Sequence, residues 1–138
     1  MSEESTTPDL SALELGRRMI AGWNKGDLRI CFSAFDPYVA VRPDRNWPER
    51  LYAGKASAEG FWRSTRETMG GLEVSIEEER DLGDRAYFRV HQPVRSRSGV
   101  QGAYSWTFIV TVREGQIILV EFFIDDAAIR AELGIAEE

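Results

Sequence analysis

The most regular hydrophobic pattern in the chain lies between Gln101 and Asp126. In its first half, large apolar side chains alternate with mostly polar ones, at Tyr104, Trp106, Phe108, Val110 and Val112. A period of two is typical of a strand with one buried face. The second half, Ile117 to Ile124, is apolar on both faces apart from Glu121, which predicts a central strand. Gly115 in the short connection favours a tight hairpin turn.

Two earlier segments, Leu72–Ile76 and Ala86–His91, also alternate, and Tyr38–Arg42 predicts a short strand that ends before a proline. In the four late strands the more apolar positions carry even numbers. They are Leu72, Val74, Ile76, Phe88, Val90, Tyr104, Trp106, Phe108, Val110, Ile118, Val120, Phe122 and Ile124. We therefore expect the even-numbered side chains to face the helices and the odd-numbered ones to form an outer face.

The first part of the chain carries helical signals instead. Ser11, with Glu14 three positions later, matches a capping box, Asp9 is an alternative cap, and the apolar stripe that follows ends at Gly26. A second short helix capped by Asp27 is predicted to end at Asp36-Pro37, because the residue before a proline avoids the helical conformation. A third helix is expected over residues 57–69 and a last short one over 127–133. Helices followed by antiparallel strands indicate the α+β class.

Composition narrows the class of protein further. The chain has 138 residues, 43% of them hydrophobic and 29% charged, with a net charge of −6. These values fit one globular domain over residues 9–138 after a disordered arm at residues 1–8. The acidic balance argues against a nucleic-acid partner, and no apolar run is long enough to cross a membrane. The polar N-terminus and the single Cys31 fit a cytoplasmic protein.

Metal binding is not expected. One histidine and one cysteine are too few for a zinc site of the usual kind. The carboxylates of Glu73, Glu77, Glu78 and Glu79 lie along one segment without convergent partners, which we interpret as a solvated strand face. No glycine-rich nucleotide-binding motif is present, so no cofactor is implied.

In this order, several short motifs resemble the superfamily of nuclear transport factor 2, the ketosteroid isomerases and the SnoaL-like polyketide cyclases. They are Trp23-Asn-Lys-Gly-Asp27, Trp47-Pro-Glu49 with Tyr52-Ala-Gly54, Asp81-Leu-Gly-Asp84, Glu114-Gly-Gln-Ile117, and Phe123-Ile-Asp125 before a helix ending at Leu133-Gly134. The last two are the strongest element of the resemblance, and together, in this order, the motifs are fairly specific for the SnoaL-like branch. The resemblance implies a cone-shaped, cystatin-like fold, in which a curved, mostly antiparallel sheet wraps around three N-terminal helices. It also implies a deep apolar pocket and a homodimer through the outer sheet face.

Two positions depart from the ketosteroid isomerases. Where those enzymes carry a tyrosine in the first helix this chain has Met19, and where they carry the catalytic aspartate it has Arg42. Methionine cannot donate a hydrogen bond to an oxyanion, and arginine stays protonated. Steroid isomerisation by that route is therefore not expected.

Three polar residues are candidates for chemistry. The resemblance assigns Asp125 as an acid/base at the end of the last strand, but Asp125 or Asp126 can equally cap the last helix. Arg42 can bind an oxyanion or carboxylate in the pocket, or pair with an acidic neighbour such as Asp44. His91, the sole histidine, is odd-numbered and so expected on the outer face.

The aromatic residues suggest the walls of a pocket. We expect these walls to include Trp23, Trp47, Tyr52, Tyr104, Trp106 and Phe122. The predicted ligand is a small apolar molecule, and the predicted function is to bind it or to convert it by cofactor-independent acid/base chemistry next to a carbonyl. The alternative is a non-catalytic binding or dimerisation module. The outer hairpin face predicts the dimer surface, formed by Ser105, Thr107, Ile109, Leu119, Glu121 and Phe123.

Overall fold

The computed structural model describes residues 10–135 except 70–72, 96–98, 100 and 125. The arm predicted at residues 1–8 lies outside this range. The elements in chain order are α1 (Ala12–Lys25), α2 (Leu28–Phe32), β1 (Phe35–Arg42), β2 (Tyr52–Ala53), α3 (Lys55–Met69), β3 (Ser75–Asp81), β4 (Arg85–Arg95), β5 (Gln101–Arg113), β6 (Gln116–Phe123) and α4 (Asp126–Leu133).

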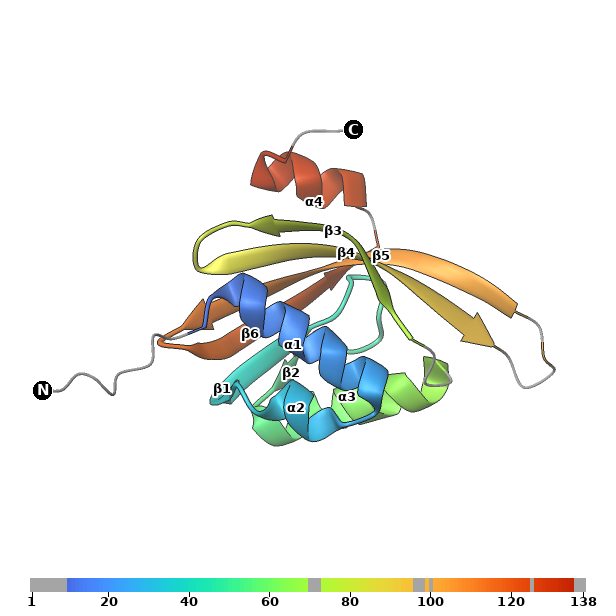
Figure 1. Ribbon diagram of the computed structural model, residues 1–138, viewed down its shortest axis with the longest axis horizontal. Helices are drawn as coiled ribbons and strands as arrows, with labels where there is room; N and C mark the ends of the chain where they lie inside the picture. The colour runs from blue at the N-terminus through green and yellow to red at the C-terminus, as the bar shows by residue number, and fades with distance from the viewer. Residues whose placement is uncertain (1–9, 70–72, 96–98, 100, 125, 136–138) are drawn as a thin grey trace, which may run out of the picture.

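The strands form one curved sheet in the order β2-β1-β6-β5-β4-β3. All neighbouring pairs are antiparallel except β1 and β6, which run parallel. Helices α1, α2 and α3 lie on one side of the sheet and α4 lies on the other (Figure 1). The α+β, cystatin-like cone predicted from the sequence is confirmed.

Helix α1 begins and ends where its sequence indicates. The Glu14 N–H donates to Ser11 Oγ over 3.1 Å, and the Ser11 N–H donates to Glu14 Oε1 over 2.9 Å. These two bonds satisfy amide groups that have no partner inside the helix. At the other end Gly26 takes a left-handed conformation with φ 74°, as glycine does without strain. Leu15, Met19 and Trp23 on the inner face of α1 are buried.

The β5–β6 hairpin is also present as predicted. Its turn places Glu114 at φ 54° and Gly115 at φ 77°, and two positive φ values define the turn that matches the twist of the strands. A bulge between Thr111 and Val112 then shifts the register, so that Val112 pairs with Ile117. The side chain buried in the core after the turn is therefore Ile117, at 1% exposure, and not the predicted Ile118.

The even-numbered face is buried only along the middle of the sheet. Phe88, Val90, Phe108, Val110 and Val120 belong to the core, as expected. Ile76, Tyr104 and Ile124 are 37%, 59% and 64% exposed, so the prediction is wrong at these strand ends. Ile76 lies on the edge strand β3, Tyr104 near the start of β5 and Ile124 just after the end of β6, and parity along the chain cannot reveal such positions.

The outer face is covered by the chain's own last helix. Tyr87, Ile109 and Ile129 form a second apolar cluster, in which Ile129 comes from α4 and Phe123 packs at the edge. Thr107 and Ile109 are 0% and 1% exposed. The expectation that Ile109 and Phe123 would be exposed on a monomer is therefore wrong. The homodimer stays a prediction, but an exposed apolar outer face no longer supports it.

Two predicted boundaries also move. Helix α2 stops at Phe32, and Asp36-Pro37 lies inside β1 instead of ending the helix. This is possible because the extended conformation is what a residue before proline prefers. Strand β3 begins at Ser75, after the predicted start, and Leu72 lies outside the described residues. Within the described residues, no helix is both long and apolar enough to span a membrane.

Candidate functional site

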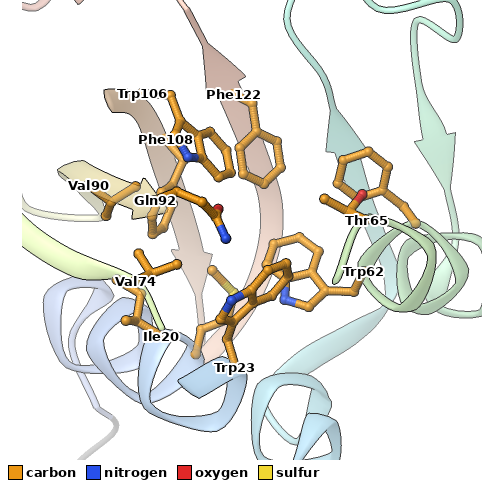
Figure 2. Close-up of a pocket in the computed structure, with 12 residues that line it drawn as sticks. Ile20, Trp23, Trp62, Thr65, Val74, Val90, Gln92, Trp106, Phe108 and Phe122 are labelled. Carbon is orange, nitrogen blue, oxygen red and sulfur yellow. The ribbon is translucent and has the colours of Figure 1, made fainter. Parts of the chain in front are cut away.

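An aromatic cavity lies between helices α1 and α3 and the concave face of the sheet (Figure 2). Most of its lining is apolar. The lining residues are Met19, Ile20, Trp23, Phe61, Trp62, Thr65, Val74, Val90, Gln92, Trp106, Phe108 and Phe122. The cavity volume is about 40 Å³. This is room for a few water molecules, whereas benzene occupies an engineered cavity of about 150 Å³.

The roof of the cavity is a continuous set of ring contacts. The ring centroids of Trp106 and Phe122 lie 4.8 Å apart, and those of Phe108 and Phe122 lie 5.9 Å apart. Trp62 reaches Phe122 from α3 at 5.6 Å. Offset and edge contacts at these distances stabilise aromatic clusters beyond the area they bury.

One polar side chain stands out in this apolar lining. Gln92 on β4 is 0% exposed, and within the described part of the chain neither its amide oxygen nor its amide nitrogen has a hydrogen-bond partner. Figure 2 shows its amide reaching toward the middle of the cavity. The indole N–H groups of Trp23 and Trp106 are also buried without a partner there. A buried amide without a partner costs a few kcal/mol, so these groups favour an occupant that accepts hydrogen bonds.

The indole N–H of Trp62 is likewise buried without a hydrogen-bond partner in the described part of the chain, and its ring lies near the Cys31 thiol. Cys31 is 1% exposed, and its thiol donates to the Met19 carbonyl over 3.1 Å. Burial raises the pKa of Cys31 to about 12, against a smaller opposing effect of Trp62. Cys31 is therefore a neutral thiol of the core, as its position on an apolar helix face predicts.

The predicted pocket residues separate into three sets. Trp23, Trp106 and Phe122 line the aromatic cavity. Trp47 and Tyr52 lie behind its wall, where each contacts the ring of Phe61, and Trp47 Nε1 donates to the Tyr52 hydroxyl over 3.2 Å.

Tyr104 lies toward the start of β5, is 59% exposed and is not in the cavity lining.

The structure places only one member of the predicted catalytic pair, Arg42. Arg42 pairs with Glu121 across neighbouring strands, with 2.8 Å between Nη1 and Oε2, and its side chain is 57% exposed. It lines a separate crevice at the surface and not the aromatic cavity. Asp125 lies outside the described residues. Among the described residues that line the cavity, none has a titratable side chain.

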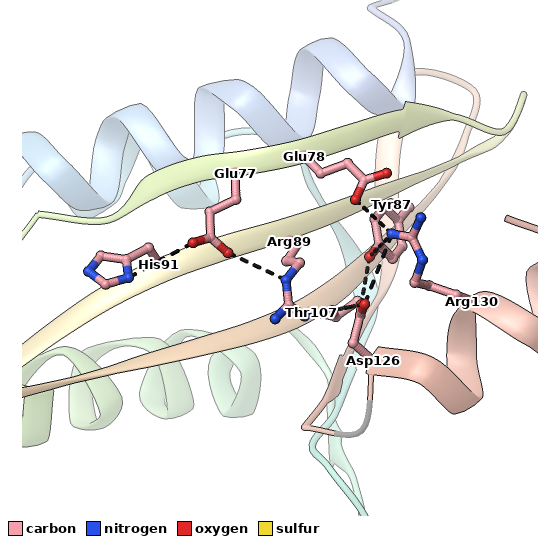
Figure 3. Close-up of polar contacts among 8 residues, drawn as sticks. All are labelled: Glu77, Glu78, Tyr87, Arg89, His91, Thr107, Asp126 and Arg130. Carbon is pink, nitrogen blue, oxygen red and sulfur yellow. Dashed lines mark hydrogen bonds and ion pairs between the residues drawn. The ribbon is translucent and has the colours of Figure 1, made fainter. Parts of the chain in front are cut away.

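Asp126, the neighbour of Asp125, holds α4 onto the outer face of the sheet (Figure 3). Its Oδ1 accepts hydrogen bonds from the hydroxyls of Tyr87 and Thr107 over 2.6 Å and 2.5 Å. Arg89 Nη1 lies 3.3 Å from its Oδ2. Burial alone would raise the pKa of the Asp126 carboxyl. The hydrogen bonds from Thr107 and Tyr87, with two nearby guanidinium groups, outweigh burial and hold that pKa below its ordinary value.

The same network extends to β3. Arg130 of α4, only 4% exposed, donates to Glu78 Oε1 over 2.6 Å and to the Tyr87 hydroxyl over 2.9 Å. Glu78 is thus part of a helix-docking network and not a solvated carboxylate as predicted, because α4 covers this end of the strand. His91 Nδ1 lies 4.0 Å from Glu77 Oε2 (Figure 3). His91 is not among the residues that line the cavity.

Sequence reasoning missed Gln92. The pattern of even-numbered apolar positions on β4, Phe88 and Val90, continues to Gln92 and predicts an inward side chain there. A glutamine at a position that should be apolar is the signal that could have identified it. Within the described residues, no cluster of three or more His, Cys, Asp or Glu side chains could hold a metal ion.

Comparison with known proteins agrees with this architecture. The family model of SnoaL-like domains matches residues 16–120. A curved sheet that wraps helices around an apolar cavity defines the cone-fold class, and within that class the chain belongs to the SnoaL-like domain family. No curated protein matches the chain in sequence.

Solved structures with low sequence identity share the fold. A putative SnoaL-like polyketide cyclase from Jannaschia sp. CCS1 is 16% identical, with a TM-score of 0.74, and the match covers 99% of this chain and 100% of the other. TerC, co-crystallised with polyporic acid, is 20% identical with a TM-score of 0.72, over 89% of this chain and 98% of TerC. AclR, a putative hydroxylase from Streptomyces galilaeus, is 14% identical with a TM-score of 0.66, and the match covers 90% of this chain and 96% of AclR.

Proposed function

We propose that this chain binds a small, mainly apolar molecule that carries an oxygen acceptor, and that the aromatic cavity is the binding site. The observation that carries the proposal is the Gln92 amide, which is fully buried, faces the cavity and has no partner in the described part of the chain. A ligand carbonyl or hydroxyl would accept from this amide and from the Trp23 or Trp106 indole. The rings around it would contact the apolar body of the ligand.

The cavity must widen to accept such a ligand. Its present volume of about 40 Å³ is below what a ring compound needs. Ile20, Thr65 and Trp106 are half-buried members of the lining and come from three different elements, α1, α3 and β5. Movement of these side chains away from one another would enlarge the cavity without disturbing the fully buried core.

Structures of the same fold support a small-molecule role. TerC was crystallised with polyporic acid, and another neighbour is a putative polyketide cyclase. At these identities the likeness concerns the fold, so the ligand of this chain is argued from Gln92 and its neighbours.

Conversion of the ligand by Asp125 and Arg42 is a second proposal that rests on the family resemblance. For it to operate, Arg42 would have to leave Glu121, because the ion pair holds its guanidinium at the surface. Binding is therefore the function that the geometry supports best.

The test compares two probes that differ only in a carbonyl, 1-tetralone and tetralin. Quenching of the fluorescence of Trp23, Trp62 and Trp106 reports binding, because all three line the cavity. We expect 1-tetralone to bind more tightly than tetralin. Gln92→Leu should weaken the affinity for 1-tetralone about fivefold, which corresponds to one net hydrogen bond, and leave the affinity for tetralin unchanged.

A matched control is Thr111→Val on β5, which alters a half-buried polar side chain outside the cavity. It should change the affinity of neither probe. Equal affinity of the two probes, with no effect of Gln92→Leu, would mean that Gln92 does not contact a ligand and would refute the proposal.

A further inference from the structure

A second concave site lies at the surface, between the loop that follows β1 and helix α4. Its volume, measured in the same way as that of the aromatic cavity, is about 390 Å³. Its lining comes from the end of β1, the loop that follows, the end of β6 and α4. This volume falls within the range of about 300–1,000 Å³ typical of small-molecule sites. We refer to it as the crevice.

The floor of the crevice is apolar. Phe122 and Phe123 come from the end of β6, Ala128 and Ile129 from α4, and Trp47 from the loop. Trp47 is 40% exposed, and its ring packs against Phe61 with a centroid distance of 5.8 Å. An aromatic and aliphatic floor of this kind favours the apolar body of an organic molecule.

The loop that carries the polar rim is held in place by Asp44. The Asp44 carboxylate accepts hydrogen bonds from the N–H of Ile124 over 2.8 Å and from the N–H of Asn46 over 3.0 Å. The Trp47 N–H donates to the Asp44 carbonyl over 2.8 Å. The negative charge of Asp44 is thus occupied by backbone amides, and the loop is anchored to the end of β6.

Two cations that line the crevice, Arg45 and Arg50, lie on this anchored loop, and a third, Arg42, is the last residue of β1. Arg42 pairs with Glu121, but the side chains of Arg45 and Arg50 form no ion pair or hydrogen bond within the described part of the chain. Two carboxylates, Glu49 on the loop and Glu132 on α4, are equally without a partner there. The unpaired charges of the crevice therefore balance, and its two unpaired guanidinium groups lie beside an apolar floor in a chain with a net charge of −6.

We propose that the crevice is a second binding site, which takes an organic carboxylate with an apolar ring. The carboxylate binds Arg45 and Arg50 on the loop side, where a planar guanidinium matches its geometry, and the ring lies on Phe123, Ile129 and Trp47. Glu132 on the opposite side opposes the ligand's charge and orients it toward the loop. This site does not depend on the aromatic cavity, although Phe122 contributes to the walls of both.

The experiment titrates the protein with 2-naphthoate and with its uncharged counterpart 2-naphthamide by isothermal calorimetry at low salt. We expect 2-naphthoate to bind more tightly than 2-naphthamide. The double variant Arg45→Gln/Arg50→Gln should weaken the affinity for 2-naphthoate about fivefold, as expected for exposed charge pairs. It should leave the affinity for 2-naphthamide unchanged. Added salt should weaken the binding of 2-naphthoate and not that of 2-naphthamide.

Two further variants test the sign of the charge effect and the location of the binding site. Glu132→Gln removes an opposing charge and should tighten the binding of 2-naphthoate. Arg113→Gln, at the exposed last residue of β5, should have no effect. Gln92→Leu should leave 2-naphthoate binding intact, which separates this site from the aromatic cavity. If 2-naphthoate binding is lost in Gln92→Leu but kept in the arginine double variant, or if the acid and the amide bind equally, the proposal is overturned.

Discussion

The Tyr87 hydroxyl donates a 2.6 Å hydrogen bond to Asp126 across 39 positions of the chain. This bond joins the outer face of the sheet to the first residue of α4. Because Thr107 and Arg89 contact the same carboxylate, Asp126 is the point at which three polar groups of the sheet meet the helix. The stability of α4 on the sheet should therefore depend strongly on this one side chain.

Replacement of Asp126 by alanine should reduce the free energy of unfolding by about 2 kcal/mol, because it leaves the fully buried Tyr87 hydroxyl without its acceptor. The Arg89 guanidinium loses one of its two carboxylate partners and keeps Glu77. Urea unfolding followed by far-UV circular dichroism measures the change. The matched control is Glu132→Ala, at an exposed position of the same helix, which should change stability by less than about 0.5 kcal/mol. Equal effects of the two substitutions would show that Asp126 does not anchor the helix.

The Asp126 carboxyl should also make stability depend on pH. Its pKa in the folded protein lies below the ordinary value of 3.8. A carboxyl with a lowered pKa contributes stability in full above its unfolded pKa and loses it as the pH falls through its folded pKa. The stability difference between the natural chain and Asp126→Asn should thus be constant above about pH 5 and shrink below about pH 4. A difference that stays constant down to acid unfolding would contradict this assignment.

Apart from the two-residue strand β2, for which the sequence predicts a loop, the order of elements could be predicted because each one carries its own local signal. The capping box of Ser11 and Glu14 and the alternation from Tyr104 to Val112 act over a few residues, and both appear in the structure. The position of α4 could not be predicted in this way. Its burial of Ile109 depends on contacts between residues far apart in the chain, which no local pattern encodes.

The candidate site was predictable only in part, for a related reason. Trp23, Trp106 and Phe122 reach the cavity because the fold brings the inner faces of α1, β5 and β6 together. Arg42 is drawn to the surface by Glu121 on the neighbouring strand, a partner that is visible only once β1 is known to pair with β6. Gln92 escaped notice because a single polar residue in an apolar series carries no motif.

The β5–β6 turn offers a stabilising substitution. Glu114 adopts φ 54°, a left-handed conformation that costs a residue with a side chain such as glutamate about 1 kcal/mol. Asparagine tolerates this conformation, and Asn-Gly is a preferred pair in such hairpins. Glu114→Asn should therefore raise the thermal midpoint, whereas Gly115→Ala should lower it, because alanine is disfavoured at the φ of 77° seen for Gly115. Differential scanning calorimetry of both variants tests the pair.

Cys31 should resist alkylation in the folded protein. Its pKa of about 12 leaves far less reactive thiolate at neutral pH than an ordinary thiol has, by roughly three orders of magnitude. At 1% exposure the sulfur is also shielded from reagents. The rate of reaction with iodoacetamide should be near zero in buffer and normal in denaturant, as followed by mass spectrometry. Rapid labelling of the folded chain would place Cys31 outside the core.

Two helical glycines should respond in opposite directions to alanine. A Cβ at Gly16 of α1 would meet the ring of Phe88 closer than real Cβ atoms allow, whereas a Cβ at Gly60 of α3 has open space around it. Alanine favours a helix over glycine by about 1 kcal/mol, so Gly60→Ala should stabilise the protein. Gly16→Ala should destabilise it by about 1–3 kcal/mol, because α1 must move away from the sheet.

A double-mutant cycle with Phe88→Leu identifies the cause of the Gly16 effect. Leucine lacks the ring atoms that the new Cβ would meet, so Phe88→Leu should cost less stability in the Gly16→Ala background than in the natural chain. Chemical unfolding of the four proteins supplies the coupling energy. Strict additivity would mean that α1 and β4 do not press on each other at this point. The close approach of Gly16 to Phe88 would then not be what sets the distance between helix and sheet.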